Sequence, residues 1–124
     1  MGESKGYIRS SDEKGSINIS EEFIAVIAAS AVIEVDGVYS LFFSYGKDGV
    51  NALSKKALSR GVRLHIEGDD VIIDVYIIAS IGYSVNLVGA DIQRAVISAV
   101  EAAVGVTVSA VNVHICGVSL KKAK

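Results

Sequence analysis

Two stretches of the chain share one pattern, a long apolar segment at helical spacing that ends at a glycine and continues into β-branched residues. The first covers residues 24–38 and the second residues 92–106, and the two align on Gly37 and Gly105. Apolar residues three and four positions apart are typical of amphipathic helices, and a glycine after the last of them is a common helix end. The chain must therefore bury two similar helices, and we expect them to have equivalent packing roles.

The surface that these helices cover is predicted to be a sheet. Residues 16–19 and 62–66 alternate between apolar and polar side chains, which indicates strands with one buried face. Residues 71–81 are apolar on nearly both sides, as expected of a central strand, and residues 67–70 form a hairpin signal. The other expected elements are an extended aromatic segment over 38–45, a turn over 46–49, a short helix over 50–59 and a last strand over 106–118.

Strands and helices in this order predict an α+β fold, in which a small, mainly antiparallel sheet is packed on one face by two long helices and one short helix. A length of 124 residues, 51% of them hydrophobic, fits one domain with one core. We expect residues 1–14 to form a flexible N-terminal arm, because they are polar and aperiodic. Residues 15–118 would form the single domain and residues 119–124 a short basic tail.

Cysteine content and hydropathy predict a cytoplasmic protein. Cys116 is the single cysteine, so no disulfide can form within the chain, which fits a reducing compartment. The polar N-terminal stretch lacks the apolar core of a secretory signal. The longest apolar run, residues 23–33, is about half as long as a membrane-spanning helix needs to be. We expect no direct membrane insertion, so that any contact with a membrane would come through a partner.

The soft metal ligands of the chain do not predict a metal site. They are His65, His114 and Cys116, whereas a zinc site needs three or four converging ligands. On the predicted strands all three residues lie on polar faces, and His114 and Cys116 share one face. The sequence also lacks the glycine-rich motifs that bind nucleotide phosphates. We therefore expect neither a metal nor a cofactor.

Acidic residues gather around the predicted hairpin as Glu67, Asp69, Asp70 and Asp74. Paired carboxylates act as acid and base where a cleft desolvates one of them, but three of these four flank a glycine turn, where exposure is expected. Asp74 interrupts an apolar strand, so it either faces solvent on the open side of the sheet or needs a partner such as Arg63. These residues predict no catalytic group, and we expect the protein not to be an enzyme.

A GxxG loop over residues 46–49 offers an alternative function. Such a loop clamps the RNA backbone in KH domains, and a small basic cluster follows it. The net charge of -2 argues against this function, because nucleic-acid affinity comes mainly from clustered Lys and Arg. An extended segment also separates the first long helix from the loop. The RNA-binding candidates of this alternative are Gly46, Lys47, Gly49, Lys55, Lys56, Arg60 and Arg63.

The densest aromatic group consists of Tyr39, Phe42, Phe43 and Tyr45. In one interpretation Phe42 or Phe43 anchors the core and the tyrosines lie at its rim. In the other the four residues form a protein contact surface, because aromatic side chains dominate the energetics of interfaces. We take all four as candidate partner-binding residues.

The ordered motifs of the chain resemble those of the alkaline shock proteins of Gram-positive bacteria, also called the general or envelope stress response family. The likeness extends from Gly15 to Val118, and the order and spacing of the motifs carry it. The matching positions are 15–20, 27–28, 35–38, 61–62, 73–76, Gly82, Asn86, Gln93, 105–108 and 111–118.

This resemblance implies a non-enzymatic, cytoplasmic α+β domain without catalytic residues. It further implies a link to cell-envelope homeostasis and, as for some family members, a small membrane-anchored partner at the inner face of the membrane. We expect a stress-associated scaffold that associates with itself or with such a partner. The last strand offers a second contact surface beside the aromatic group, because an alternating strand at a sheet edge is a template for pairing. KH-like RNA binding through the GxxG loop remains the alternative.

Overall fold

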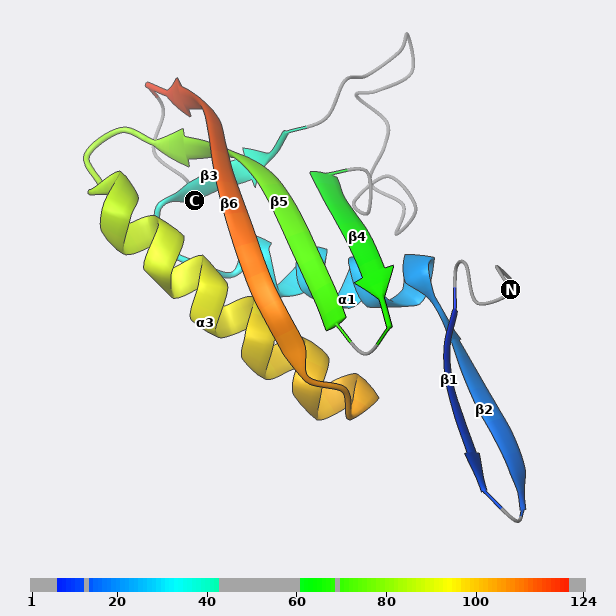
Figure 1. Cartoon of the computed structure of the whole chain (residues 1–124). Coiled ribbons are helices and arrows are strands. Elements are labelled where there is room, and N and C mark those ends of the chain that lie inside the picture. Colours follow the sequence, from blue (N-terminus) through cyan, green and yellow to red (C-terminus); the bar gives the residue numbers. More distant parts are fainter. Residues whose placement is uncertain (1–6, 13, 43–60, 69, 121–124) are drawn as a thin grey trace, which may run out of the picture.

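The computed structural model describes residues 7–12, 14–42, 61–68 and 70–120 (Figure 1). The expected turn over 46–49 and short helix over 50–59 lie outside these residues. The described elements, in chain order, are β1 (Tyr7–Asp12), β2 (Gly15–Ser20), α1 (Glu21–Ile33), β3 (Val38–Leu41), β4 (Val62–Glu67), β5 (Asp70–Ser80), α3 (Val85–Val104) and β6 (Val108–Ser119).

Strand β5 is the centre of a four-stranded sheet, as the sequence predicts. β4 pairs antiparallel with the first half of β5, and β3 pairs antiparallel with the second half of β5. β6 pairs parallel with β5 along nearly its full length. Because a strand has two edges, β6 occupies one edge of β5 while β3 and β4 share the other. The sheet is mainly antiparallel, and α3 supplies the helical crossover that the parallel pair requires.

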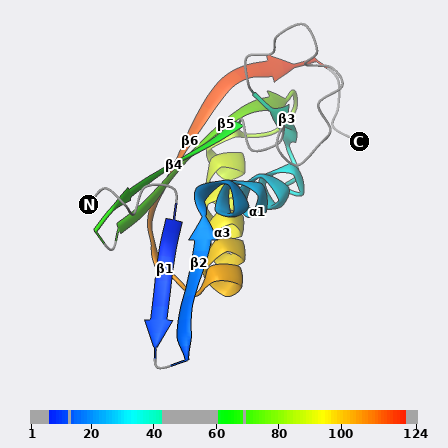
Figure 2. The ribbon, with the colours of Figure 1, turned by 90° about the vertical axis from the view of Figure 1, so that its right-hand side faces the viewer.

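Both long helices cover one face of this sheet, which confirms the predicted α+β fold (Figure 2). β5 alternates strictly over Val71–Ala79, so that every second side chain is buried against the helices. α1 and α3 contact each other and each buries one stripe, which confirms their equivalent roles. The fully buried side chains of the helices include Ile24, Ala28 and Val32 from α1 and Ile92, Val96 and Val100 from α3.

Local residue chemistry sets the start of α1 and the end of α3, and the predicted glycine end of the second long helix at Gly105 is confirmed. The Ser20 hydroxyl accepts a hydrogen bond from the Phe23 backbone N–H at 3.1 Å, and Gly105 ends α3 in the left-handed region at φ 82°. α1 differs from the prediction because it ends at Ile33, before Gly37. Backbone bonds from residues 34 and 35 to residues 31 and 32 tighten the chain into a turn there.

Residues 7–12 also differ from the prediction, since they form β1 where the sequence predicted part of a flexible arm. β1 pairs antiparallel with β2 from Tyr7↔Ser20 to Asp12↔Gly15. The two strands form a hairpin that projects away from the four-stranded sheet and leads directly into α1 (Figure 1). A polar strand in an isolated hairpin lacks the apolar alternation by which strands are recognised, so the sequence gives no signal for β1.

Candidate functional site

Large apolar side chains are exposed where the ends of β3, β5 and β6 meet the start of α3. Isolated apolar residues on a surface are normal, whereas a group of them is a feature of interaction sites. The exposed fractions of these side chains lie between 42% and 67%. We call the group the apolar end; its members are Tyr39, Ile81, Tyr83, Val85, Leu87 and Val118.

Backbone contacts bring these residues together from four elements. The Ile81 N–H donates to the Ser119 carbonyl oxygen at 2.9 Å, which joins the ends of β5 and β6. Val38 and Val118 are both ladder partners of Ala79, one on each side of β5. The three strand ends and the first turn of α3 therefore lie at the same end of the molecule (Figure 1).

Two of the four predicted partner-binding residues are described, and both are partly exposed. Tyr39 belongs to the apolar end, and Phe42 is 43% exposed just past the last residue of β3. The Phe42 N–H donates to the Tyr76 carbonyl oxygen at 2.8 Å. Phe42 is thus at the surface and not a core anchor. Phe43 and Tyr45 lie outside the described residues.

The sequence prediction missed the members of the apolar end that follow β5. Ile81, Tyr83, Val85 and Leu87 alternate with small or polar residues across the turn into α3. In the sequence, Ile81 closes the apolar run that predicts the central strand, and residues 82–86 predict the turn that leads into the second long helix. The alternation of these four residues is the sequence signal for the apolar end. It places large apolar side chains between the end of β5 and the first turn of α3, where neither β5 nor α3 can bury them.

The open face of the sheet carries a polar cluster around Asp74. One carboxylate oxygen of Asp74 accepts a hydrogen bond from Nδ2 of Asn112 at 3.0 Å and lies 3.3 Å from Nε2 of His114. The other lies 3.2 Å from Nε2 of His65. The His114 ring stacks on Tyr76 with centroids 4.5 Å apart. Asp74 therefore faces the open side of the sheet, as one predicted alternative has it, and the side chains next to its carboxylate are these histidines and Asn112, not Arg63.

Burial and bonding act in opposite directions on Asp74, whose side chain is only 14% exposed. Burial alone would raise the pKa of the carboxyl group. The hydrogen bonds from Asn112 and His114 and the charges of His114 and His65 outweigh burial and hold the pKa below its ordinary value. The cluster ties β4, β5 and β6 together, and among the described residues no group of three or more His, Cys, Asp and Glu is arranged to hold a metal ion.

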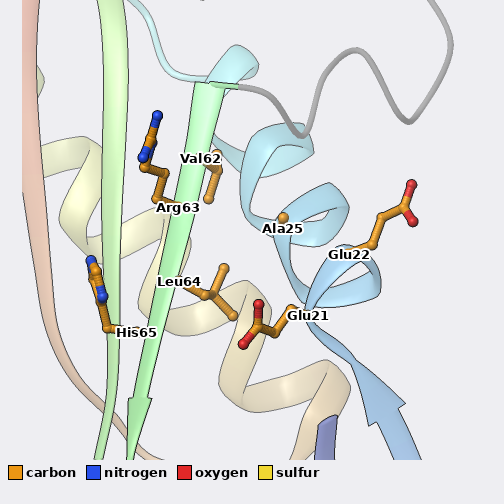
Figure 3. Close-up of a pocket in the computed structure, with 7 residues that line it drawn as sticks. All are labelled: Glu21, Glu22, Ala25, Val62, Arg63, Leu64 and His65. Atoms are coloured by element: carbon orange, nitrogen blue, oxygen red, sulfur yellow. The ribbon is translucent and has the colours of Figure 1, made fainter. Parts of the chain in front are cut away.

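A groove of about 360 Å³ lies between the start of α1 and β4 (Figure 3). Val62 and Leu64 point from β4 towards α1, whereas Arg63 and His65 point to the other side of the strand. Arg63 is the described member of the predicted RNA-binding set. The other six residues of that set lie outside the described residues, so RNA binding stays a prediction.

Comparison with known proteins identifies the family. The sequence model of the alkaline shock protein 23 family, described as having a cell envelope-related function, matches residues 9–120. The uncharacterized protein YloU of Bacillus subtilis is 36% identical over 106 residues, which cover 84% of this chain and 88% of YloU. The uncharacterized protein Spy1535 of Streptococcus pyogenes is 37% identical over 109 residues, or 87% of this chain and 82% of that protein. No solved structure matches the chain.

The chain therefore belongs to the alkaline shock protein 23 family, which confirms the resemblance drawn from its motifs. Within the described part of the chain, neither helix has the length and apolar character needed to cross a membrane.

Proposed function

We propose that this member of the alkaline shock protein 23 family is a non-enzymatic, stress-associated scaffold that serves cell-envelope homeostasis through protein contacts. It associates with itself or with a membrane-anchored partner that holds it at the inner face of the membrane. The observation that carries the proposal is the apolar end, where six exposed large apolar side chains from four elements lie at one end of the molecule.

The composition of the apolar end suits a protein interface. Tyr39 and Tyr83 supply the aromatic side chains that most often dominate binding energy. Leu87 is exposed in the first turn of α3, where the helix leaves it no inward-facing position. Removal of such a patch from water is favourable by roughly 25 cal/mol for each Å² of apolar surface, which gives a partner protein a clear gain.

The proposal is tested by crosslinked capture of the tagged full chain from a native lysate, with and without nuclease. The decisive variant is Leu87→Asp, because an acid in the first turn of a helix is compatible with the helix dipole. The matched control is Ile17→Asp on β2, since Ile17 is 65% exposed and Leu87 67%. We expect Leu87→Asp to lose its protein partner, or its self-association in sedimentation, while Ile17→Asp retains it.

Two results would overturn the proposal. If both variants capture the same proteins as the wild type, the apolar end is not the contact surface. If enrichment disappears on nuclease treatment, the partner is a nucleic acid, and binding through the GxxG loop and its basic neighbours becomes the better explanation.

A further inference from the structure

Two side chains of α3 bind main-chain atoms of β6. The Glu101 carboxylate accepts a hydrogen bond from the Val108 N–H at 2.8 Å, and the Gln93 side-chain amide donates to the Val111 carbonyl oxygen at 3.0 Å. Both contacts fall on the first part of β6. One edge of β6 pairs with β5, and none of the described strands pairs with its other edge.

A groove opens between α3 and β6 beyond these contacts. The residues of α3 that line the groove belong to the first half of the helix, and the helix approaches β6 towards its own C-terminus (Figure 1). The volume of the groove is about 290 Å³. Gly89 and Ala90 set the helix wall back, and a Cβ at Gly89 would meet no atom within 4 Å. The lining residues are Val85, Asn86, Gly89, Ala90, Gln93, Val113 and Ile115.

None of the residues that line the groove is charged. A charged group placed there would lose its hydration without gaining an opposite charge, so the groove favours an uncharged occupant. β6 itself has no Asp, Glu, Lys or Arg from Val108 to Ser119, and thus lacks the charges that usually keep an edge strand from pairing. An edge strand flanked by a helix is an arrangement that binds extended peptides by strand addition.

We propose that the groove between β6 and α3 binds an extended, uncharged segment of a partner protein, which pairs with the free edge of β6 as an additional strand. Every second side chain of the segment points into the groove, where Gly89 and Ala90 leave room for an apolar group. The inference rests on the proposed function in one respect, that the partner is a protein, and it names the part of the partner that is bound.

A segment of another protein fits this edge better than β6 of a second copy. A second copy would bring its own α3, which follows the same edge and binds β6 through Gln93 and Glu101. The two helices would then compete for the space beside the paired strands. An extended segment without such a helix meets no obstacle.

The probe for this test is a phage-displayed library of random ten-residue peptides, selected on the immobilised full chain. Selected peptides are synthesised with a fluorescent label, and their Kd is measured by anisotropy. The groove-filling variant is Gly89→Leu, whose side chain enters the empty space. The control is Ala102→Leu, which also introduces a leucine, at an exposed position of the same helix.

We expect the selected peptides to be uncharged with alternating apolar residues, and to bind Gly89→Leu at least tenfold more weakly than the wild type. Ala102→Leu should bind them as the wild type does. Bound peptide should slow hydrogen exchange of backbone amides in the second half of β6. Because leucine is a better helix former than glycine, loss of binding by Gly89→Leu cannot be attributed to unfolding of α3, which thermal denaturation of both variants verifies.

Three results would overturn the inference: a library that yields no binding peptide, peptides that bind Gly89→Leu as tightly as the wild type, or a dimer of the wild type that Gly89→Leu dissociates. The last would assign the groove to a second copy.

If the groove fails in one of the first two ways while Leu87→Asp still loses its captured partner, the proposed function stands without the groove. If Leu87→Asp loses nothing while Gly89→Leu loses its peptide, the groove stands and the apolar end fails.

Discussion

Oδ2 of Asp74 lies 3.2 Å from Nε2 of His65, and Oδ1 of Asp74 lies 3.3 Å from Nε2 of His114. The two histidines come from the strands on either side of β5, so one carboxylate links three neighbouring strands across the open face of the sheet. Asn112 adds a third bond to the same group. This arrangement explains how an acidic residue is accommodated in the middle of an apolar central strand.

The lowered pKa of Asp74 predicts a specific loss of stability in acid. A carboxyl group whose pKa is lower in the folded than in the unfolded state stabilises the fold. This contribution is fully present at pH values above the pKa of the unfolded chain, which is about 3.9 for Asp. The contribution is lost as the pH falls through the folded pKa, because the unfolded chain takes up its proton first. We expect Asp74→Asn to lose less stability than the wild type between pH 5 and pH 2.5 in urea unfolding.

Asn112→Ala provides the graded comparison for this prediction. It removes one of the bonds that lower the pKa of Asp74 and leaves the carboxylate in place. Its acid sensitivity should therefore fall between that of the wild type and that of Asp74→Asn. Identical pH profiles for all three proteins would show that Asp74 contributes nothing to the acid response.

The sequence predicts most of the fold because its signals are local. The glycine that ends the second long helix at position 105, the alternation of β4 and the apolar run of β5 each depend on a few neighbouring residues, and all three predictions hold. The missed strand β1 depends on its pairing with β2, and Gly37, which the sequence marks as the end of the first helix, instead lies past that end and against Val88 of α3. Such long-range contacts leave little trace in a short window of sequence.

The candidate site is less predictable for the same reason. Tyr39 and Phe42 stand out as aromatic residues, but the apolar end also needs Ile81 and Leu87, which resemble core residues in the sequence. Only the register of β5 with its neighbours shows that the chain passes the end of the sheet at Ser80. Gln93 likewise has no chemical signature, and its contact with Val111 requires the crossover of α3 onto β6.

The close approach of α3 predicts that Gly37→Ala destabilises the fold strongly. Gly37 has a φ of 96°, and a Cβ there would lie 2.5 Å from Cγ2 of Val88. Backbone strain and overpacking together should cost about 2–4 kcal/mol. Gly105→Ala is the control, because φ is 82° there but no atom lies within 4 Å of the added group. Equal losses for the two variants in urea unfolding would show that contact with Val88 is not what requires glycine at position 37.

The two long helices are capped differently, which predicts different effects of one substitution. Ser20 accepts a hydrogen bond from the Phe23 N–H, whereas Ser84 precedes α3 without a side-chain cap bond. Loss of a serine N-cap bond costs about 1 kcal/mol. We therefore expect Ser20→Ala to lower the free energy of unfolding by about that amount, and Ser84→Ala to leave it nearly unchanged. A larger loss for Ser84→Ala would contradict the assigned caps.

Ile77 and Ile81 belong to the same apolar run of the sequence, and the structure gives them opposite roles. Ile77 is fully buried against the helices, while Ile81 lies past the end of β5 in the apolar end. Ile77→Ala should lower the free energy of unfolding by about 2–5 kcal/mol, because it leaves a cavity in the core. Ile81→Ala should change it by less than about 0.5 kcal/mol but weaken partner capture. Comparable losses of stability would place Ile81 in the core and remove it from the interaction surface.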